Sequence, residues 1–183
     1  PSDVTFQDLE QGKIDMAVNR FDRLPQSFHQ ATVWRDSFSC LMSSENKALD
    51  NFDMDAFLAA PHIWVSKTGM GVGRGMSHRD SQRLGWVDEA LAEVGHERQI
   101  RVFTRHYQVA ALLARHPDLI ATLPTQVAKL YADDPRLAVR KPPFMIIPIE
   151  LKLAWSPLLQ HDPGHIWLRR RIVDMGQEMI EHG

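Results

Sequence analysis

The sequence predicts an α/β fold, in which short apolar strands alternate with amphipathic helices. Three observations predict it. Apolar runs such as RQIRVFT and DLIATL are each followed by a helical pattern, apolar residues recur at offsets of three and four within 80–94, and 44% of the 183 residues are hydrophobic, enough for a substantial core. Because alternation of this kind is typical of parallel strands with crossover helices, we expect a mostly parallel sheet covered by helices.

The first half of the chain supplies four elements by pattern. TFQDLEQG predicts a short helix, with Thr5 as N-cap and Gly12 at a C-terminus that needs a positive φ. KIDMAV and then VWRDSFSCLMS have the alternation or apolar run of extended strands. Residues 80–94 predict an amphipathic helix that buries Leu84, Val87 and Leu91, and Gly95 closes it.

The second half repeats the alternation of strand and helix. Pro117 stops one predicted helix, Pro124 suits the first position of another, and Asp162 before Pro163 suits the start of the last. The predicted strands are 98–104, 118–123 and 146–155, and the predicted helices are 106–116, 124–132 and a final one from Pro163.

Charge and composition exclude several classes of protein. The net charge of −2 lacks the basic excess of a nucleic-acid-binding surface, and the single Cys40 excludes an internal disulfide. No apolar run reaches the roughly 18 residues of a membrane helix, and the N-terminus lacks a signal-peptide profile. Because the first residue is Pro1, we expect the chain to be part of a longer one.

The glycine-rich stretch SKTGMGVGRGMSHRDSQRLGW raises the question of phosphate binding. A dinucleotide loop needs G-x-G-x-x-G, but Met76 stands where the third glycine would follow Gly71 and Gly73. No Gly-Lys-Ser/Thr follows either, so a phosphate P-loop is also excluded. We interpret the stretch as a long connection whose glycines supply backbone freedom, with or without a ligand role at its start.

Other candidate sites have simpler structural explanations. His161, Asp162 and His165 have the spacing of a zinc cluster, but Asp-Pro opening a helix explains them without a metal. Cys40, in an apolar strand, is expected to be buried rather than redox-active. Two further sets lie on the last predicted helix, where we expect a solvated face at 169–171 and core positions at Leu168, Ile172, Met175 and Met179.

Five segments in order and spacing make the chain resemble a known family. They are DLEQGKIDMAV, LPQSFHQATVWRDSFSCLMSSENKAL, HIWVSKTG, DLIATLPTQVAKLY and LKLAWSPLLQHDPGHIWLRRRI. Together they resemble the effector-binding domain of the LysR-type transcriptional regulators of bacteria. The resemblance implies two α/β lobes of the periplasmic-binding-protein type II kind, joined by two crossing strands. It places the first lobe at 1–42 and 144–183 and the second at 43–143.

The resemblance also implies partners outside this chain. In the family a winged-helix domain upstream binds DNA, and a strand, a helix and a strand precede DLEQGKIDMAV. We therefore expect DNA contact only through that separate domain, and a homo-oligomer, dimer or tetramer, in the full-length protein. We expect a cytoplasmic location without membrane contact, no cofactor, no metal and no enzymatic activity.

The expected site is a small-molecule cleft between the lobes. The resemblance makes HIWVSKTG a strand whose carboxyl end, Ser66, Lys67 and Thr68, faces this cleft. TRHYQ begins a helix after a strand, so its amides, with Arg105 or His106, suit an anion; the alternative is that His106 only caps or packs locally. We expect a small, acidic or aromatic effector.

A different class of function stays open at this point. A periplasmic-type solute-binding protein shares the two-lobed architecture but delivers its ligand to a transporter. An enzyme ranks behind both, because the motifs supply no nucleophile with a base and an orienting partner.

Overall fold

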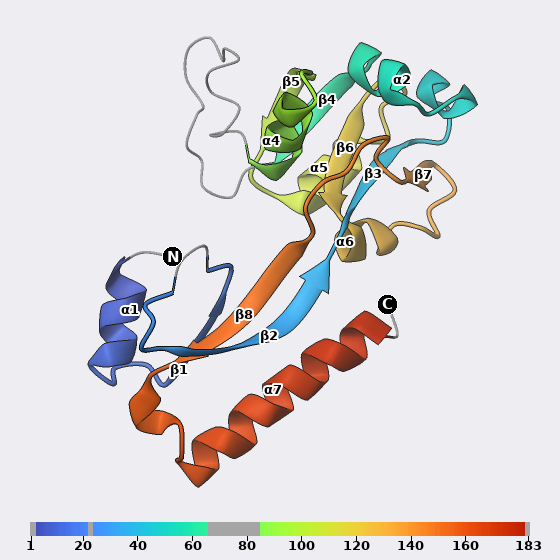
Figure 1. Ribbon diagram of the computed structural model, residues 1–183. Coiled ribbons are helices and arrows are strands. Elements are labelled where there is room, and N and C mark those ends of the chain that lie inside the picture. Colours follow the sequence, from blue (N-terminus) through green and yellow to red (C-terminus); the bar gives the residue numbers. More distant parts are fainter. Residues whose placement is uncertain (1–2, 22–23, 66–84, 182–183) are drawn as a thin grey trace. The chain divides into compact units, whose positions relative to one another are not determined.

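The computed structural model describes residues 3–21, 24–65 and 85–181, which form two compact units (Figure 1). The first unit comprises Pro1–Asp36 and Pro148–Gly183, and the second comprises Ser37–Ile147. The chain therefore crosses from one unit to the other twice. The second unit extends a few residues beyond each end of the expected lobe, 43–143.

The first unit contains a three-stranded sheet and a long C-terminal helix. The sheet has the order β1-β8-β2, and both pairings are antiparallel, with Met16 and His29 each opposite Trp155. Its elements are α1 (Asp3–Glu10), β1 (Met16–Asn19), β2 (His29–Asp36), β8 (Ile149–Trp155), the 3-10 helix η3 (Pro157–Leu159) and α7 (Pro163–Glu181).

The N-terminal helix ends as predicted and begins earlier than predicted. Gly12 has φ +67°, the left-handed conformation that the sequence required after the helix. Thr5 is not the N-cap, because α1 begins at Asp3 and Thr5 lies within it.

Helix α7 packs on β2 through one narrow face. Ile172 and Val173 contact a small core formed by Val33, Leu153 and Trp155. Gly176 lies against the backbone of Val33, where a Cβ would overlap the carbonyl oxygen. The helix can approach the strand this closely only because residue 176 has no side chain.

The predicted core positions of α7 were wrong in three of four cases. Ile172 is half-buried, but Leu168, Met175 and Met179 are 43%, 61% and 53% exposed. The buried face is shifted around the helix because Gly176 makes the closest contact with β2. The apolar spacing was correct for a helix but pointed to a face that the described residues leave open to solvent.

The second unit contains a five-stranded mixed sheet covered by helices. Its order is β5-β4-β6-β3-β7, and its core packs Leu41, Ile63 and Leu123 against the alanine face of α5. The elements are β3 (Phe38–Ser43), η1 (Lys47–Asp50), α2 (Met54–Ala59), β4 (Pro61–Val65), α4 (Trp86–Glu93), β5 (Gln99–Thr104), α5 (Tyr107–Leu113), β6 (Ile120–Pro124), α6 (Thr125–Lys129) and β7 (Leu137–Arg140).

The expectation of a mostly parallel sheet was wrong. Among the described strands, only β4 with β5 and β4 with β6 run parallel, whereas β3 runs antiparallel to β6 and β7, and both described pairings of the first unit are antiparallel. Crossover helices enforce parallel pairing only along β4, β5 and β6. Strand β3 instead follows β2 directly, with Ser37 alone between them, so no crossover constrains its direction.

The helix expected at 80–94 is observed from Trp86 onward. Val87 and Leu91 are buried as predicted, while Leu84 lies outside the described residues. Gly95 closes α4 with φ +77°; its N–H donates to the carbonyl of Ala92, and the His96 N–H donates to that of Leu91. This pair of bonds is a Schellman motif, which explains why the glycine predicted the helix end.

The second unit buries several polar groups, among them an ion pair beside the amino end of β5. Arg98 donates two hydrogen bonds to Asp88, Nε to Oδ1 at 2.9 Å and Nη2 to Oδ2 at 2.7 Å, and both side chains are almost fully buried. Cys40 is buried as predicted, and burial raises the pKa of its thiol to about 12. The described core therefore holds its charges as a pair and its thiol neutral.

His62 is a buried neutral base beside this pair. Its Nε2 lies 2.6 Å from the carbonyl oxygen of Phe57, so Nε2 carries the proton and donates it. Burial and the nearby charge of Arg98 together lower the pKa of His62 to about 3, although the hydrogen bond to the Phe57 carbonyl opposes the shift. Protonation of His62 would place a second positive charge in the core near Arg98.

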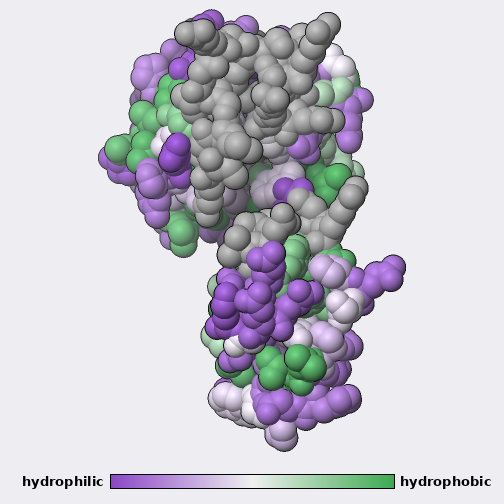
Figure 2. Space-filling view, turned by 90° about the vertical axis from the view of Figure 1, so that its left-hand side faces the viewer, coloured by the Kyte–Doolittle hydropathy of each residue, from purple (hydrophilic) through white to green (hydrophobic). Residues whose placement is uncertain are grey.

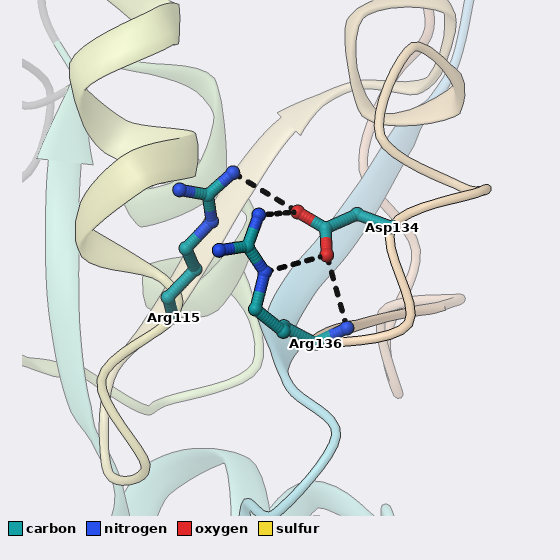
Figure 3. A network of polar contacts seen from close by, with 3 residues as sticks. All are labelled: Arg115, Asp134 and Arg136. Carbon is teal, nitrogen blue, oxygen red and sulfur yellow. Dashed lines mark hydrogen bonds and ion pairs between the residues drawn. The ribbon is translucent and has the colours of Figure 1, made fainter.

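A surface network closes the loop between α6 and β7 (Figure 3). Asp134 accepts hydrogen bonds from the backbone N–H and both Nε and Nη2 of Arg136, and from Nη2 of Arg115, which follows α5. Hydrogen bonds from Arg136 hold the pKa of Asp134 well below its usual range. The carboxylate thereby ties the loop to the end of α5.

One face of the described surface is mainly polar. On the face drawn in Figure 2, hydrophilic side chains predominate, with separate hydrophobic areas among them. No helix among the described residues is both long and apolar enough to cross a bilayer.

Replacing Gly176 by alanine should destabilise the first unit. In a helix interior this change usually stabilises by about 1 kcal/mol, but here the added methyl overlaps the Val33 carbonyl, and we expect a net loss of about 1–3 kcal/mol. Urea unfolding followed by circular dichroism measures it. Gly164→Ala, whose Cβ would meet only an ordinary 3.4 Å contact, is the matched control. A stabilised Gly176→Ala variant would refute the close approach.

Because the pKa of His62 is lowered in the folded protein, the free energy of unfolding should fall on mild acidification. The unfolded histidine takes its proton near pH 6.5 and the folded one near 3, so the unfolded state gains protons first and stability drops below pH 6.5. Between pH 7.5 and 5, the free energy of unfolding of the His62→Gln variant should fall by ~2 kcal/mol less than that of the unsubstituted protein. His96→Gln, at an exposed position, is the control. Urea unfolding at both pH values decides, and equal losses in all three proteins would contradict the assignment.

Candidate functional site

Three strands of the second unit end at the same edge of its sheet. Val65, the last residue of β4, is the register partner of Thr104, the last residue of β5. Strand β6 runs parallel on the other side of β4, with Ile63 opposite Ala121, so it too ends at this edge, at Pro124. In open α/β sheets, ligands bind beyond such carboxyl ends.

The sequence-predicted site residues divide into two groups. Ser66, Lys67 and Thr68 lie outside the described residues; they follow Val65 directly in the sequence. Arg105 and His106 are described, follow Thr104 at the shared edge, and are exposed. The register therefore places Val65, which precedes Ser66, beside Thr104, which precedes Arg105.

The backbone of His106 is capped by its neighbour. Its N–H donates to Oγ1 of Thr104 at 3.2 Å, and its own side chain makes no capping hydrogen bond although it occupies the N-cap position of α5. Local capping by the imidazole, the structural alternative, is therefore not observed. The exposed guanidinium of Arg105 adds a full positive charge at the same strand end.

A cluster of three hydroxyls at this edge was missed by sequence reasoning. Thr125, the first residue of α6, has its Oγ1 2.8 Å from Oγ of Ser37 and 2.9 Å from Oγ of Ser39. Its N–H also donates to the carbonyl of Ser37 at 2.8 Å. Ser37 is exposed, Thr125 is half-buried and Ser39 is buried. We call these three side chains the hydroxyl cluster.

Two weak signals in the sequence pointed to this cluster. Ser37 and Ser39 are two residues apart, so they share one face of a strand, and Thr125 follows a proline that ends another strand. Nothing local shows that these segments meet, because the antiparallel register of β3 with β6 places Phe38 opposite Pro124 across a long sequence separation.

The chemistry of this edge favours binding over catalysis. Hydroxyls both donate and accept hydrogen bonds, and a chain of three that bond to one another still has donor and acceptor positions for a ligand. These hydroxyls pair with each other rather than with a histidine or carboxylate that could act as a general base. Together with Arg105, they suit a small polar or anionic molecule.

A shallow groove of about 430 Å³ lies elsewhere in the second unit. Pro61 at the start of β4 and Asp118 before β6 line it, which places it at the amino ends of these strands. The other lining residues are Asn46, Lys47, Ala48, Ala56, Ala59 and Ala60. Because it lies at the sheet edge opposite the strand carboxyl ends, it is separate from the candidate site.

Asp162 and His165, at the start of α7, have structural roles. Asp162 Oδ1 accepts the His165 N–H at 2.7 Å, which confirms it as a helix cap. The His165 ring lies between the Asp15 carbonyl, 3.1 Å from Nε2, and Arg169, 2.9 Å from Nδ1. Among the described residues no cluster of three metal-binding side chains is found.

The interpretation of 169–171 as a solvated face was wrong for its first member. Arg169 donates to the carbonyls of Leu159 and Gln160, and its guanidinium lies 4.6 Å from the ring centroid of Trp155. A planar cation with five donors can satisfy both carbonyls and stack on an aromatic ring at once. Arg170 and Arg171 are exposed as expected.

Known proteins resemble the chain over almost its whole length. The LysR substrate binding domain family matches residues 1–177. The HTH-type transcriptional regulator SyrM of Rhizobium meliloti is 28% identical over 166 residues, covering 90% of this chain and 48% of that protein. The HTH-type transcriptional regulator LinR of Sphingobium indicum is 29% identical over 162 residues, covering 88% of this chain and 50% of that protein. The chain thus spans about half the length of these curated relatives.

Solved structures share the fold. The regulatory domain of MexT, a transcriptional activator in Pseudomonas aeruginosa, matches with a TM-score of 0.69 and 29% identity, over 91% of this chain and 75% of that one. The effector binding domain of QuiR, in complex with shikimate, matches with a TM-score of 0.65 over 96% and 78%. At 13% identity the second likeness is one of fold alone.

Proposed function

The chain belongs to the LysR substrate binding domain family, and from this premise we propose that it senses a small effector for a bacterial transcriptional regulator. Its fold is of the periplasmic-binding-protein type II kind, as the sequence predicted, and its relatives are named regulators rather than enzymes. DNA contact would come from another part of the protein, since the chain spans about half of those relatives.

The convergence of strand ends and hydroxyls at one edge of the second unit carries this proposal. Hydrogen-bond donors from Thr125 and Ser37 lie where β6 ends and β3 begins. A helix-start amide near His106 and the charge of Arg105 lie at the end of β5, and β4 runs between β5 and β6. Such an arrangement selects a ligand by directed hydrogen bonds rather than by apolar area. Ser66, Lys67 and Thr68 complete the proposed site from the end of β4.

We take the effector to be a small organic acid, with or without an aromatic ring. Hydroxyls and amides donate hydrogen bonds to a carboxylate, and a guanidinium matches its two oxygens. A domain of the same fold, QuiR, binds shikimate, which supports an acid as the ligand class without transferring that ligand to this chain. The proposed position is the cleft that the family resemblance implies between the two lobes.

Binding would act on an equilibrium that exists before the ligand arrives. An effector changes regulation only if it binds one arrangement of the two units better than another. In the proposed function this preference is passed to the DNA-binding part through a homo-oligomer, in the cytoplasm and without membrane contact. The alternative of a periplasmic-type solute-binding protein is not favoured, because the matched relatives are transcriptional regulators.

Removing the Thr125 hydroxyl should weaken effector binding. Thr125→Val keeps the side-chain shape but loses the central member of the hydroxyl cluster. A hydrogen bond to a charged group contributes about 1.5–3 kcal/mol, so Kd should rise roughly 10- to 150-fold. Thr68→Val should behave similarly if its hydroxyl faces the ligand. Calorimetry of the full-length regulator against a panel of small organic acids makes the measurement.

Thr122→Val is the matched control for this experiment. Thr122 lies on β6, the strand that leads to Thr125. It is buried, and its hydroxyl contacts the Cys40 thiol at 3.6 Å. Its loss should leave Kd nearly unchanged. A less than threefold change in Thr125→Val would remove the hydroxyl cluster from the site, and binding of neutral or cationic compounds alone would refute the anionic effector.

A further inference from the structure

The groove at the amino end of β4 has the size of a small-molecule site. Its volume of about 430 Å³ lies within the usual range for sites that bind small organic compounds. The pairing of His62 with Ile120 brings the start of β4 beside the turn before β6, and η1 and α2 contribute most of the other lining residues. The groove therefore lies within the second unit, at the sheet edge opposite the proposed effector site.

Small apolar side chains line the groove where α2 leads into β4. They are those of Ala56 and Ala59 on α2, Ala60 directly after the helix and Pro61 at the start of β4, and we call them the alanine wall. Ala56 is half-buried and Ala59 is exposed, so their methyl groups are accessible from the groove. Side chains of this kind offer no hydrogen bonds, and they suit an apolar part of a ligand.

Three further lining residues carry polar groups of different kinds. Lys47 supplies an ammonium, Asp118 a carboxylate and Asn46 an amide. The side chains of Lys47 and Asp118 are exposed, and neither forms a hydrogen bond or an ion pair with any residue that the structure describes. One groove therefore presents two opposite charges that do not neutralise each other in a pair.

Asn46 is the buried member of this polar group, with only 6% of its surface exposed. Its Oδ1 accepts the Ala48 N–H at 2.9 Å, which fixes the orientation of the amide. Its Nδ2 lies 3.5 Å from the carbonyl oxygen of Leu119, longer than the roughly 2.7–3.2 Å of an ordinary N–H···O bond. The Asn46 amide therefore keeps hydrogen-bond donor capacity for a ligand.

We propose that this groove binds a small zwitterion with an apolar side chain, the chemistry of a free α-amino acid. The ligand carboxylate accepts hydrogen bonds from Lys47 Nζ and Asn46 Nδ2, and the ligand ammonium donates to the carboxylate of Asp118. The ligand side chain covers the alanine wall. Because both charged side chains are exposed to water, the binding is weak, with a Kd of about 0.1–1 mM.

NMR of the 183-residue chain, labelled at its alanine methyl groups, tests whether the groove is occupied. L-phenylalanine, added to about 20 mM, should shift the methyl signals of Ala56 and Ala59 until they saturate. The methyl signal of Ala92, which is exposed on α4, should stay unchanged. Signals of Ala56 and Ala59 that do not move, or that never saturate, overturn the proposal.

Ligand analogues that lack one charge test the recognition of a zwitterion. Binding of 3-phenylpropionate, which has no ammonium, and of 2-phenylethylamine, which has no carboxylate, should each be about 5- to 10-fold weaker than that of L-phenylalanine. L-alanine, which has no ring to cover the alanine wall, should also bind more weakly. Equal affinity for the three phenyl compounds would mean recognition by apolar contact alone, which contradicts the proposal.

Charge-neutralising variants assign the two charges to their residues. Asp118→Asn should weaken L-phenylalanine binding about 5- to 10-fold but leave 3-phenylpropionate unaffected, because that compound has no ammonium for Asp118 to bind. Lys47→Gln should weaken L-phenylalanine equally but leave 2-phenylethylamine unaffected. Thr125→Val should not change the Kd at the groove, since the hydroxyl cluster lies at the opposite sheet edge, so this result does not depend on the proposed effector site. Equal losses for all three compounds in either charge variant would refute the assignment.

A variant that fills the groove tests the position of the ligand. Ala56→Leu adds a larger side chain to the alanine wall and should abolish the shift of the Ala59 methyl signal. Ala92→Leu makes the same change on the exposed side of α4 and should leave binding intact. Retained binding in Ala56→Leu would place the ligand outside the groove.

Discussion

The parallel register of β4, β5 and β6 is the constraint on which the candidate site depends. Backbone hydrogen bonds set Val65 beside Thr104 and Ile63 beside Ala121, and a slip of one residue would turn each side chain of a strand to the other face of the sheet. The strands therefore end together, and helices α5 and α6 start there. Site residues from distant parts of the sequence are brought to one edge by main-chain geometry.

Buried polar groups stabilise the opposite end of these strands without leaving a lone charge inside. The Asp88–Arg98 pair joins the first turn of α4 to the residue before β5, and each partner satisfies the other bidentately. Removing one partner would leave an uncompensated buried charge, a costly change, although the intact pair need not add net stability. His62 stays neutral in the same region, so the amino end is secured while the carboxyl end keeps polar groups accessible.

The sequence predicted features that depend on near neighbours and missed those that depend on distant ones. Gly12 and Gly95 predicted helix ends because a positive φ is a local requirement. The hydroxyl cluster could not be predicted, because Ser37 and Thr125 meet only through the pairing of β3 with β6. Periodicity identified α7 as a helix but misplaced its buried face, since the decisive contact is Gly176 with a strand far away in the sequence.

The position of Ser37 links the proposed site to the division of the chain into two units. Ser37 is the first residue of the second unit and the only residue between β2 and β3. Its hydroxyl and its carbonyl both bond to Thr125, so the start of α6 is tied to the crossing itself. In the proposed function, a ligand that reorders the hydroxyl cluster would act directly on one of the two covalent connections between the units. A sensor built this way needs no long chain of intermediate contacts, because the binding group and the connection are the same residue.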